Sequence, residues 1–450
     1  MIAPARVAAY DILLAVSGGR ADLPAAIAHA RSTLKDDRDR ALASEIASGV
    51  QRWRAAIDHV IAHFSKRSID RLDEQVLEIL RLSAYQLLYL TRVPASAVVD
   101  DAVNLTGRMG KRSAAGLVNA VLRSISRHRG ALPVPPRPAD PGDRDAAMAY
   151  LSVTLSHPRW LVERWLDRFG FDAAERWLQF DNAPAPLTLR VNRLRATPAG
   201  VIARLEQDDV VLTPGRFSPD ALIVERGHPL RTAATGLFVV QDEASQLVAL
   251  LAGERPGGRV LDACASPGGK TSALAAAMNG AGFLVACDVR DRRMQLLRRT
   301  IDATGATNAR LVQADLLKPL PFSRPFDCVL VDAPCSGLGI LRRDPDIRWR
   351  RRDDDLPSLA AAQLVMLQHA AASVAAGGRL IYATCSSEPE ENEAVAAAFL
   401  ATSPDFTAVD LRRHDTALPA AVIDARGHLR TYPHVHGLEA FFGAVFLLRS

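Results

Sequence analysis

Apolar residues recur every three or four positions through the first part of the chain. Three such series lie at residues 7–14, 42–61 and 76–87, and a shorter one follows near 117–125. This spacing gives a helix one buried face, and no convincing strand pattern interrupts it. The pattern therefore predicts an all-α bundle over residues 1–130.

Two segments with different sequence patterns follow the predicted bundle. Residues 131–144 contain five prolines, which exclude a helix and favour an extended linker. Residues 145–235 mix helical patterns with short strand-like runs near 187–191 and 222–224, which predicts a small α+β unit. The three tryptophans of this unit can either stack on nucleic-acid bases or fill a core, because they follow helical spacing: Trp160, Trp165 and Trp177.

From residue 236 to 450 strand-like and helix-like segments alternate. Five β-rich apolar runs end in polar turns, in the segments RVLDACA, FLVACD, ARLVQAD, FDCVLVDAPC and GRLIYATC. This alternation predicts a parallel, doubly wound sheet of the Rossmann-like α/β type. Such sheets bind ligands at the carboxyl ends of their strands, so the residues that end each run are the candidates for function.

Composition narrows the class of protein. A chain of 450 residues with 48% apolar residues predicts several globular domains, and no apolar run reaches the length of a membrane span. Five cysteines, an odd number, favour a reducing, cytoplasmic location. The net charge of +5, carried mostly by arginine, indicates either a polyanionic partner or an arginine-biased surface.

A glycine loop follows the first predicted strand of the α/β part. Gly268 and Gly269 let a ligand approach the backbone, and the next helix offers its N-terminal amides. A P-loop is excluded because its first glycine would fall on Cys264, and no G-x-G-x-x-G pattern occurs. Asp288 ends the second run at a ribose-binding spacing, and Asp315 ends the third. The series predicts a site for an adenosine-type ligand.

Two cysteines follow the fourth and fifth strands directly. Cys335 and Cys385 precede turns, whereas Cys287 and Cys328 lie within strands and are expected to be buried. The segment 387–390 has the form of a capping box, and a helix starting there would lower the pKa of Cys385. No cysteine or histidine cluster has metal spacing, so no metal is expected, and the histidines of TYPHVHG are interpreted as structural or RNA-facing.

A thiolate suits the methylation of carbon 5 of cytosine. Addition of the thiolate to carbon 6 makes carbon 5 nucleophilic enough to accept a methyl group. A carboxyl group on ring nitrogen 3 assists the addition, and a base must remove the carbon 5 proton before the thiolate leaves. Asp332 is placed for the first task, and Cys335 and Cys385 are candidates for nucleophile and release group.

The motifs DACASPGGKT, DAPCSG and ATCSSEPEEN resemble those of RNA cytosine-5 methyltransferases of the NOL/NOP/Sun type. The domain order is similar to that of bacterial family members with an N-terminal NusB-like domain, which modify 16S ribosomal RNA, and the resemblance covers essentially the whole chain. It implies a NusB-like RNA-binding bundle, a small RNA-contacting unit and a methyltransferase domain. Its implied partner is 16S ribosomal RNA or an early small-subunit assembly intermediate. Nothing in the sequence demands an oligomer, so a monomer is expected.

The resemblance also implies roles for single residues. Cys385 would be the nucleophile and Cys335 would assist product release, while Lys270 would reach the target base. Ser266 departs from the family, which usually has alanine there, and adds a hydroxyl beside the ligand. S-adenosylmethionine would be bound by the glycine loop and the acids at the strand ends, namely Cys264, Ala265, Ser266, Pro267, Gly268, Gly269, Lys270, Asp288, Asp315 and Asp332.

An arginine-rich loop, GLGILRRDPDIRWRRRDDD, follows Cys335. Its basic residues either hold RNA phosphates and stack a base or form a solvated surface balanced by Asp353 to Asp355. A target base within structured RNA must also be swung out to reach the site. The candidates for RNA contact are Arg342, Arg343, Arg348 and Trp349.

Two alternatives remain beside this interpretation. The chain can be a catalytically inactive binding module, in which the helical bundle binds RNA and the α/β part has lost its activity. The chemistry can also act on transfer RNA, another RNA or DNA. The series of acids and the two strand-end cysteines favour an active enzyme, and the helical N-terminal part favours ribosomal RNA by resemblance alone.

Overall fold

The structure is a computed structural model that describes residues 2–234, 236–414 and 416–449. Its contacts divide the chain into two compact units. The first comprises residues up to 183 together with 341–353, and the second comprises 184–340 together with the residues from 354 onward. The C-terminal part of the chain therefore contributes one short segment, residues 341–353, to the helical unit.

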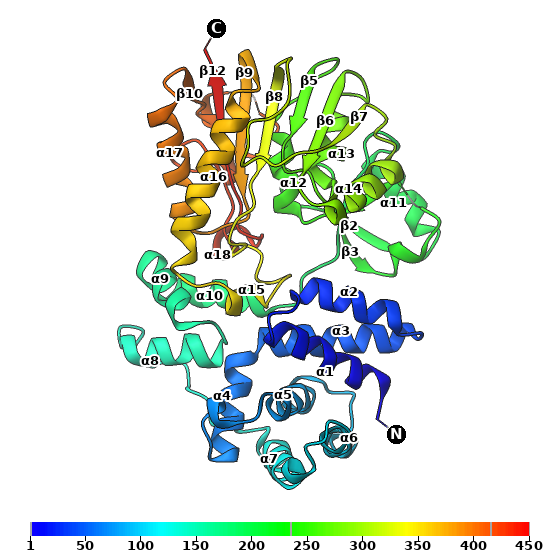
Figure 1. Ribbon diagram of the computed structural model, residues 1–450, viewed down its shortest axis with the longest axis vertical. Helices are drawn as coiled ribbons and strands as arrows, with labels where there is room; N and C mark the ends of the chain where they lie inside the picture. The colour runs from blue at the N-terminus through cyan, green and yellow to red at the C-terminus, as the bar shows by residue number, and fades with distance from the viewer. Residues whose placement is uncertain (1, 235, 415, 450) are drawn as a thin grey trace. The chain divides into compact units, whose positions relative to one another are not determined.

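The first unit is helical, as Figure 1 shows for the segments coloured blue to cyan. Asp36 and Asp73 cap two of its helices by accepting hydrogen bonds from backbone amides of the first turn. Its helices are α1 (Pro4–Ser17), α2 (Leu23–Thr33), α3 (Asp37–Arg52), α4 (Arg54–Ser65), α5 (Glu74–Tyr89), α6 (Ala95–Arg108), α7 (Ala115–His128), α8 (Arg144–Ala149), α9 (Arg159–Phe169), α10 (Phe171–Asn182) and α15 (Ile347–Arg350).

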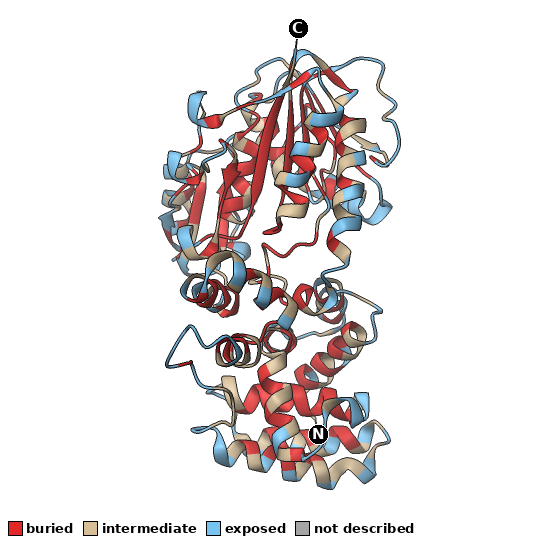
Figure 2. Ribbon diagram, turned by 90° about the vertical axis from the view of Figure 1, so that its left-hand side faces the viewer, coloured by how far each residue is buried: buried red, intermediate tan, exposed pale blue. Residues whose placement is uncertain are grey.

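The predicted helical series correspond to the buried faces of this bundle. Figure 2 shows these faces turned inward, and the all-α prediction for the N-terminal part is confirmed. The series at 42–61 is divided at Trp53, where α3 ends and α4 begins. Residues 131–143 contain no helix or strand. Among the described residues, no helix is both long enough and apolar enough to cross a bilayer.

The tryptophans of α9 and α10 belong to the interior. Trp165 and Trp177 have no exposed surface and stack on each other with ring centroids 4.4 Å apart. Trp160 is partly exposed. Because a ring without exposed surface offers no face to a base, the structure favours the core role for Trp165 and Trp177.

A small antiparallel sheet opens the second unit. Its order is β2–β3–β1–β4, with β1 (Thr188–Val191), β2 (Val211–Pro214), β3 (Ala221–Arg226) and β4 (Phe238–Val240). Helix α11 (Pro198–Glu206) packs Val201 and Leu205 against Leu189 and Val191. The predicted boundary falls on residue 235, which lies outside the described residues, and β4 beyond it pairs with β1. This sheet therefore continues past the predicted boundary.

The large sheet of the second unit positions the site. Its order is β10–β12–β9–β8–β5–β6–β7, and β11 pairs with β12. The five predicted strands, β5 to β9, are parallel to one another, as expected. The strand β12, which was not among the predicted runs, is antiparallel to β9 and to β10, so the sheet as a whole is mixed. The strands are β5 (Arg259–Asp262), β6 (Phe283–Asp288), β7 (Ala309–Gln313), β8 (Phe326–Asp332), β9 (Val374–Thr384), β10 (Phe406–Ala408), β11 (Leu429–Arg430) and β12 (Phe442–Leu448).

Helices cover both faces of this sheet, as Figure 1 shows. Alternate strand residues separate the two cores, because successive side chains point to opposite faces. Val260 and Leu284 share one core with α12, α13 and α14, whereas Leu261 and Val285 share the other with α16 and α17. These helices are α12 (Glu243–Leu250), α13 (Gly269–Ala277), α14 (Asp291–Thr304), α16 (Asp355–Ala371) and α17 (Glu393–Thr402), and α18 (Pro433–His436) is a short turn.

Candidate active site

A cavity of about 310 Å³ lies where β5 and β8 end. The parallel strands bring their carboxyl ends to one edge, so residues distant in sequence meet there. Most of the predicted cofactor residues line this cavity, but Gly268, Asp288 and Asp315 are not among its lining residues. The lining residues are Val239, Val240, Gln241, Ser245, Cys264, Ala265, Ser266, Pro267, Gly269, Lys270, Thr300 and Asp332.

The glycine loop has a backbone that only glycine fits at Gly268. Its φ is +104°, and a Cβ there would lie 3.0 Å from Leu297 Cδ1 and from Thr300 Cβ on α14. The Ser266–Pro267 peptide bond is cis. Helix α13 begins immediately afterwards at Gly269, so its N-terminal amides follow the loop directly.

The two acids that follow β6 and β7 hold loop backbone. The Asp288 carboxyl accepts hydrogen bonds from Val289 N at 2.8 Å and from Ser266 N at 3.3 Å, so it supports the glycine loop from behind. Asp315 accepts one from Leu317 N at 3.0 Å. Contact of either acid with a ligand therefore stays a prediction.

Lys270 and Asp332 form an ion pair on the cavity wall. Lys270 Nζ lies 2.7 Å from Asp332 Oδ2 and 3.0 Å from Ser245 Oγ. Burial alone would lower the pKa of the Lys270 amine, but the charge and hydrogen bond of Asp332 outweigh it and raise that pKa above its ordinary value. Lys270 is therefore a stable cation at neutral pH.

The two predicted reactive cysteines meet at the ends of β8 and β9. Cys335 Sγ and Cys385 Sγ are 3.2 Å apart, and both residues are partly exposed. The hydrogen bond to Cys385, together with burial, holds the pKa of the Cys335 thiol well above its ordinary value. Cys335 is thus protonated at neutral pH. Cys287 and Cys328 have no exposed surface, as expected, and burial raises their pKa values to about 12 and about 11.

The capping box predicted after Cys385 is wrong. The segment Pro389–Glu391 forms a short 3₁₀ turn, and α17 begins only at Glu393. Asn392 precedes the helix, and its side chain bonds back to the turn, donating to Ser386 O at 2.9 Å. The carboxylates and amides of this segment therefore organise the Cys385 turn itself.

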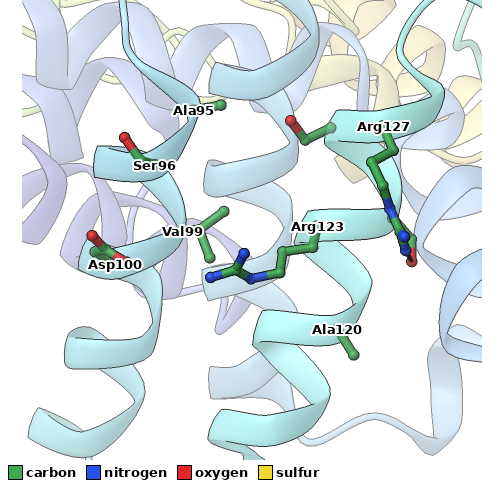
Figure 3. Close-up of a pocket in the computed structure, with 9 residues that line it drawn as sticks. Ala95, Ser96, Val99, Asp100, Ala120, Arg123 and Arg127 are labelled. Atoms are coloured by element: carbon green, nitrogen blue, oxygen red, sulfur yellow. Dashed lines mark hydrogen bonds between the residues drawn. The ribbon is translucent and has the colours of Figure 1, made fainter.

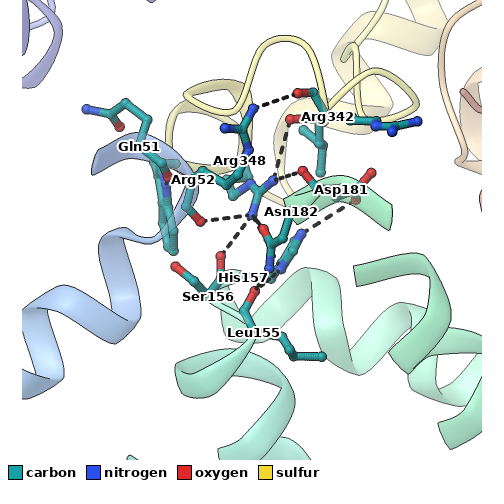
Figure 4. A network of polar contacts seen from close by, with 11 residues as sticks. Gln51, Arg52, Leu155, Ser156, His157, Asp181, Asn182, Arg342 and Arg348 are labelled. Atoms are coloured by element: carbon teal, nitrogen blue, oxygen red, sulfur yellow. Dashed lines mark hydrogen bonds and ion pairs between the residues drawn. The ribbon is translucent and has the colours of Figure 1, made fainter. Parts of the chain in front are cut away.

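The arginine-rich segment belongs to the first unit. Arg348 has no exposed surface and donates to Ser156 O and Asn182 Oδ1, each at 3.0 Å, with longer bonds to three other backbone oxygens (Figure 4). Trp349 Nε1 donates to Gln51 O at 2.6 Å. Because its side chain is fully buried, Arg348 has no surface to offer RNA, which corrects the expectation for this residue.

The other two arginines that were predicted to contact RNA, Arg342 and Arg343, are partly exposed. The Arg342 guanidinium lies over the Phe180 ring at 4.3 Å and donates to Ala183 O at 3.2 Å. Arg343 is also half-buried. RNA contact by Arg342 and Arg343 stays a prediction.

A second hollow, of about 490 Å³, lies in the first unit between α6 and α7 (Figure 3). Arg123 and Arg127 are exposed on α7, and Arg123 Nε donates to Asn119 Oδ1 at 2.9 Å. Ser96 and Asp100 lie on the facing helix α6. The hollow is therefore a polar groove with two guanidinium groups along one wall.

The described residues contain no cluster of three or more potential metal ligands. His436 accepts a hydrogen bond at Nδ1 from Tyr432 N at 2.8 Å. This intramolecular hydrogen bond gives His436, one of the two histidines of the TYPHVHG segment, a structural role.

Models of three protein families match the chain in the order of its domains. The NusB family matches residues 3–127, a ferredoxin-like domain of RsmF/B-like methyltransferases matches 157–231, and the 16S rRNA methyltransferase RsmB/F family matches 249–447. The probable ribosomal RNA small subunit methyltransferase B of Bacillus subtilis is 33% identical over 92% of this chain and 91% of its own length. The chain belongs to the RsmB/F family of 16S rRNA methyltransferases.

A further relative and two solved structures are also similar to the chain. The ribosomal RNA small subunit methyltransferase B of Pseudomonas putida is 36% identical over 90% of this chain and 91% of its own length. The crystal structure of PH0851 matches 99% of both chains with a TM-score of 0.80 and 26% identity. A methyltransferase homolog from Pyrococcus horikoshii matches 67% of this chain and 99% of its own, with a TM-score of 0.58 and 27% identity. The expected order of a NusB-like bundle, an α+β unit and a Rossmann-like methyltransferase domain is confirmed.

Several residues of this RsmB/F site were not anticipated from the sequence. Gln241 and Ser245 line the cavity ahead of the glycine loop, and Ser245 accepts from Lys270. Glu391 is fully buried next to the cysteine turns. The only sequence signal was the acidic run around Glu391, which also fits the start of a helix.

Proposed function

We propose that this RsmB/F family member transfers a methyl group from S-adenosylmethionine to carbon 5 of a cytosine in 16S ribosomal RNA. The observation that carries the proposal is the pair of partly exposed sulfurs of Cys335 and Cys385, 3.2 Å apart beside the Lys270–Asp332 ion pair. Two cysteines at the tips of neighbouring strands serve a reaction that both forms and breaks a sulfur–carbon bond.

Cys385 is the nucleophile of this mechanism. Its sulfur lone pair forms a bond to carbon 6 of the cytosine, which makes the former double-bond electrons available at carbon 5. After carbon 5 has accepted the methyl group, a base removes the carbon 5 proton, the double bond re-forms and the sulfur–carbon 6 bond breaks. The raised pKa of Cys335 supports this assignment, because a protonated Cys335 can donate a hydrogen bond to the Cys385 sulfur.

Asp332 and Lys270 are placed to orient the base. A carboxyl group that bonds ring nitrogen 3 of cytosine draws electron density from carbon 6 and so assists addition. The Asp332 carboxyl lies on the cavity wall, and the cationic Lys270 amine holds it there at 2.7 Å. We therefore assign Asp332 to the cytosine ring and Lys270 to positioning Asp332 and reaching the base.

The cavity fits an adenosine-type methyl donor. Gln241 Oε1 is buried on its wall without a hydrogen-bond partner among the described residues, so it offers an acceptor to a ligand donor. The sulfonium of S-adenosylmethionine, when bound, supplies the methyl group. The loop from Cys264 to Lys270 would hold this donor, with Asp288 and Asp315 assigned to its ribose and adenine.

The RNA would be held by both units of a monomer in the cytoplasm. In the first unit, the groove between α6 and α7 presents Arg123 and Arg127, which suit the phosphate backbone. Arg342 and Arg343 remain candidates after Cys335. We propose naked 16S RNA or an early small-subunit assembly intermediate as substrate, with transfer RNA or another RNA as the alternative.

The test is methyl transfer from labelled S-adenosylmethionine to 16S RNA by wild type, Cys385→Ala and Cys335→Ala. We expect Cys385→Ala to abolish transfer, and Cys335→Ala to accumulate a protein–RNA adduct that is retarded on a denaturing gel. The matched control is Cys328→Ala, which removes a thiol buried inside β8.

The outcomes separate the alternatives. An adduct in Cys385→Ala instead of Cys335→Ala would exchange the two roles. Transfer to transfer RNA but not to 16S RNA would keep the chemistry and change the substrate. Binding of RNA by wild type without any methyl transfer would support the inactive binding module.

A further inference from the structure

Glu391 occupies a fully buried position between the turns that carry the two reactive cysteines. Its Oε1 atom accepts hydrogen bonds from Ser336 N at 2.8 Å and from Gln363 Nε2 at 2.9 Å. Its Oε2 atom accepts from Ser386 Oγ at 2.5 Å. Both nitrogens can only donate, so Oε1 must be an acceptor in this arrangement.

These contacts reach the residue directly after each cysteine. Ser336 follows Cys335 and Ser386 follows Cys385, and the two serine hydroxyls are themselves 3.1 Å apart. One carboxyl group therefore joins the β8 turn to the β9 turn at the position next to the sulfur pair.

The surroundings hold Glu391 in place from both sides. The Tyr382 hydroxyl on β9 lies 2.5 Å from the Glu391 main-chain carbonyl oxygen and 3.0 Å from Gln363 Oε1, so these two acceptors share its single hydrogen. Gln363 lies on α16, so a helix and both turns bind the Glu391 carboxyl, and a strand binds its main-chain carbonyl. Such a closed network gives the side chain one orientation, because each polar group in it has a fixed partner.

Burial of a carboxyl group at this interior position is energetically unfavourable unless the group is paired or hydrogen-bonded. Among the described residues, no lysine, arginine or histidine forms an ion pair with Glu391, so only hydrogen bonds offset its burial. Its negative charge is also one of the causes that raise the pKa of the Cys335 thiol. Both its geometry and its charge therefore act on the cysteine pair.

We propose that Glu391 is a positioning residue for the methyl transfer, which fixes the spacing of the Cys335 and Cys385 sulfurs and keeps Cys335 in the release role. The inference rests on the proposed function for the meaning of that role. It adds a residue that touches neither base nor donor and acts through Ser336 and Ser386.

The experiment compares Glu391→Gln with Glu388→Gln in the full chain. Glu388 is also fully buried in the same segment, and its carboxyl accepts from Ser387 Oγ at 2.7 Å, so this variant matches the size and burial of the change. The first readout is methyl transfer to 16S RNA, measured in single turnover for the rate and in steady state for KM, with the adduct fraction on a denaturing gel. The second is the pH profile of alkylation of each cysteine by iodoacetamide, followed by peptide mass spectrometry.

We expect Glu391→Gln to slow methyl transfer by about 10-fold to 100-fold with KM for RNA nearly unchanged, because sulfur placement affects the reaction and not RNA binding. The adduct should persist longer than in wild type. The alkylation profile of Cys335 should move to lower pH, because one cause of its raised pKa has gone. Loss of buried packing alone would move neither the profile nor the adduct lifetime.

Wild-type values for both readouts in Glu391→Gln, or the same changes in Glu388→Gln, would overturn the inference. If Glu391→Gln does not fold, Ser386→Ala removes one of the three donors and should show a smaller change in the same direction; an unchanged adduct lifetime in it would also overturn the inference. If wild type transfers no methyl group, the proposed function fails, while the alkylation profiles still decide whether Glu391 controls Cys335.

Discussion

A single residue can decide whether the glycine loop forms, and Gly268 is the clearest example. We expect Gly268→Ala to weaken binding of S-adenosylmethionine and to lower the free energy of unfolding by about 1–3 kcal/mol, since it forces alanine to a positive φ and against α14. The measurements are calorimetric titration and urea unfolding.

The matched control is Gly257→Ala. Gly257 has a φ of +73°, but a Cβ there would meet nothing within 4 Å. Both variants carry the backbone penalty, so any extra loss in Gly268→Ala reports the contact with Leu297 and Thr300. Equal binding and equal stability of the two variants would contradict this account of the loop.

Residue positions in the site could be predicted from the sequence where they depend on a local motif. The glycine loop, Cys335 and Cys385 stand at strand ends, which the apolar runs locate. The burial of Arg348 could not be predicted, because its partners Ser156 and Asn182 lie more than 160 positions away along the chain. A run of arginines with a tryptophan has the same composition whether it faces RNA or the interior.

At the scale of secondary-structure elements, the turn from Thr384 to Asn392 holds the residues around Cys385 in place. Asn392 is fully buried, accepts a hydrogen bond from Thr384 Oγ1 and donates to Ser386 O. We expect Asn392→Ala to lower the free energy of unfolding by about 1–3 kcal/mol, because it leaves buried polar groups without partners. Urea unfolding would measure the change.

Asn104→Ala is the control for this element, since Asn104 is exposed within α6. A loss in Asn392→Ala no larger than in Asn104→Ala would show that the turn is held by its other contacts. Ser386 remains bonded to Glu391 in both proteins, which keeps this test separate from that of Glu391.

Helical periodicity and strand runs predicted most elements of the sheet and bundle, and the parallel direction of β5 to β9, but not the antiparallel edge of the large sheet. Strand β12 is an apolar run like its neighbours, and nothing in its own residues shows that it is antiparallel to β9. The start of α17 was misplaced because a serine followed by glutamates satisfies a capping pattern, while the folded turn gives Ser387 a bond to Glu388.

At the scale of the whole molecule, the segment 341–353 brings a buried charge into the helical unit. Its Arg348 lies near Asp181, which itself lies 3.5 Å from His157 (Figure 4). Burial raises the pKa of Asp181 from 3.8 to about 7, against the lowering effect of Arg348. The folded unit therefore holds a proton on Asp181 that the unfolded chain releases between these two values.

This difference fixes the sign of a pH effect. Between about pH 4 and pH 7 the folded state binds more protons at Asp181 than the unfolded state, so raising the pH lowers stability through this group. We expect Asp181→Asn to remove that loss, so that its stability relative to wild type rises with pH. Urea unfolding of both proteins at several pH values would measure it.

Other titrating groups are common to both proteins in this comparison. Asp262, whose pKa burial also raises to about 7, contributes the same slope to each. A constant stability difference between wild type and Asp181→Asn across this range would contradict the predicted titration.

The placement of residues 341–353 in the helical unit also determines where such proteins can be truncated or have their domains exchanged. A fragment that ends at residue 183 lacks Arg348 and Trp349, so the carbonyl groups of Gln51 and Ser156 lose the donors that occupy them in the intact protein. The helical part is therefore not a transferable cassette. If the helical domain is exchanged between relatives, residues 341–353 must be exchanged together with the helices.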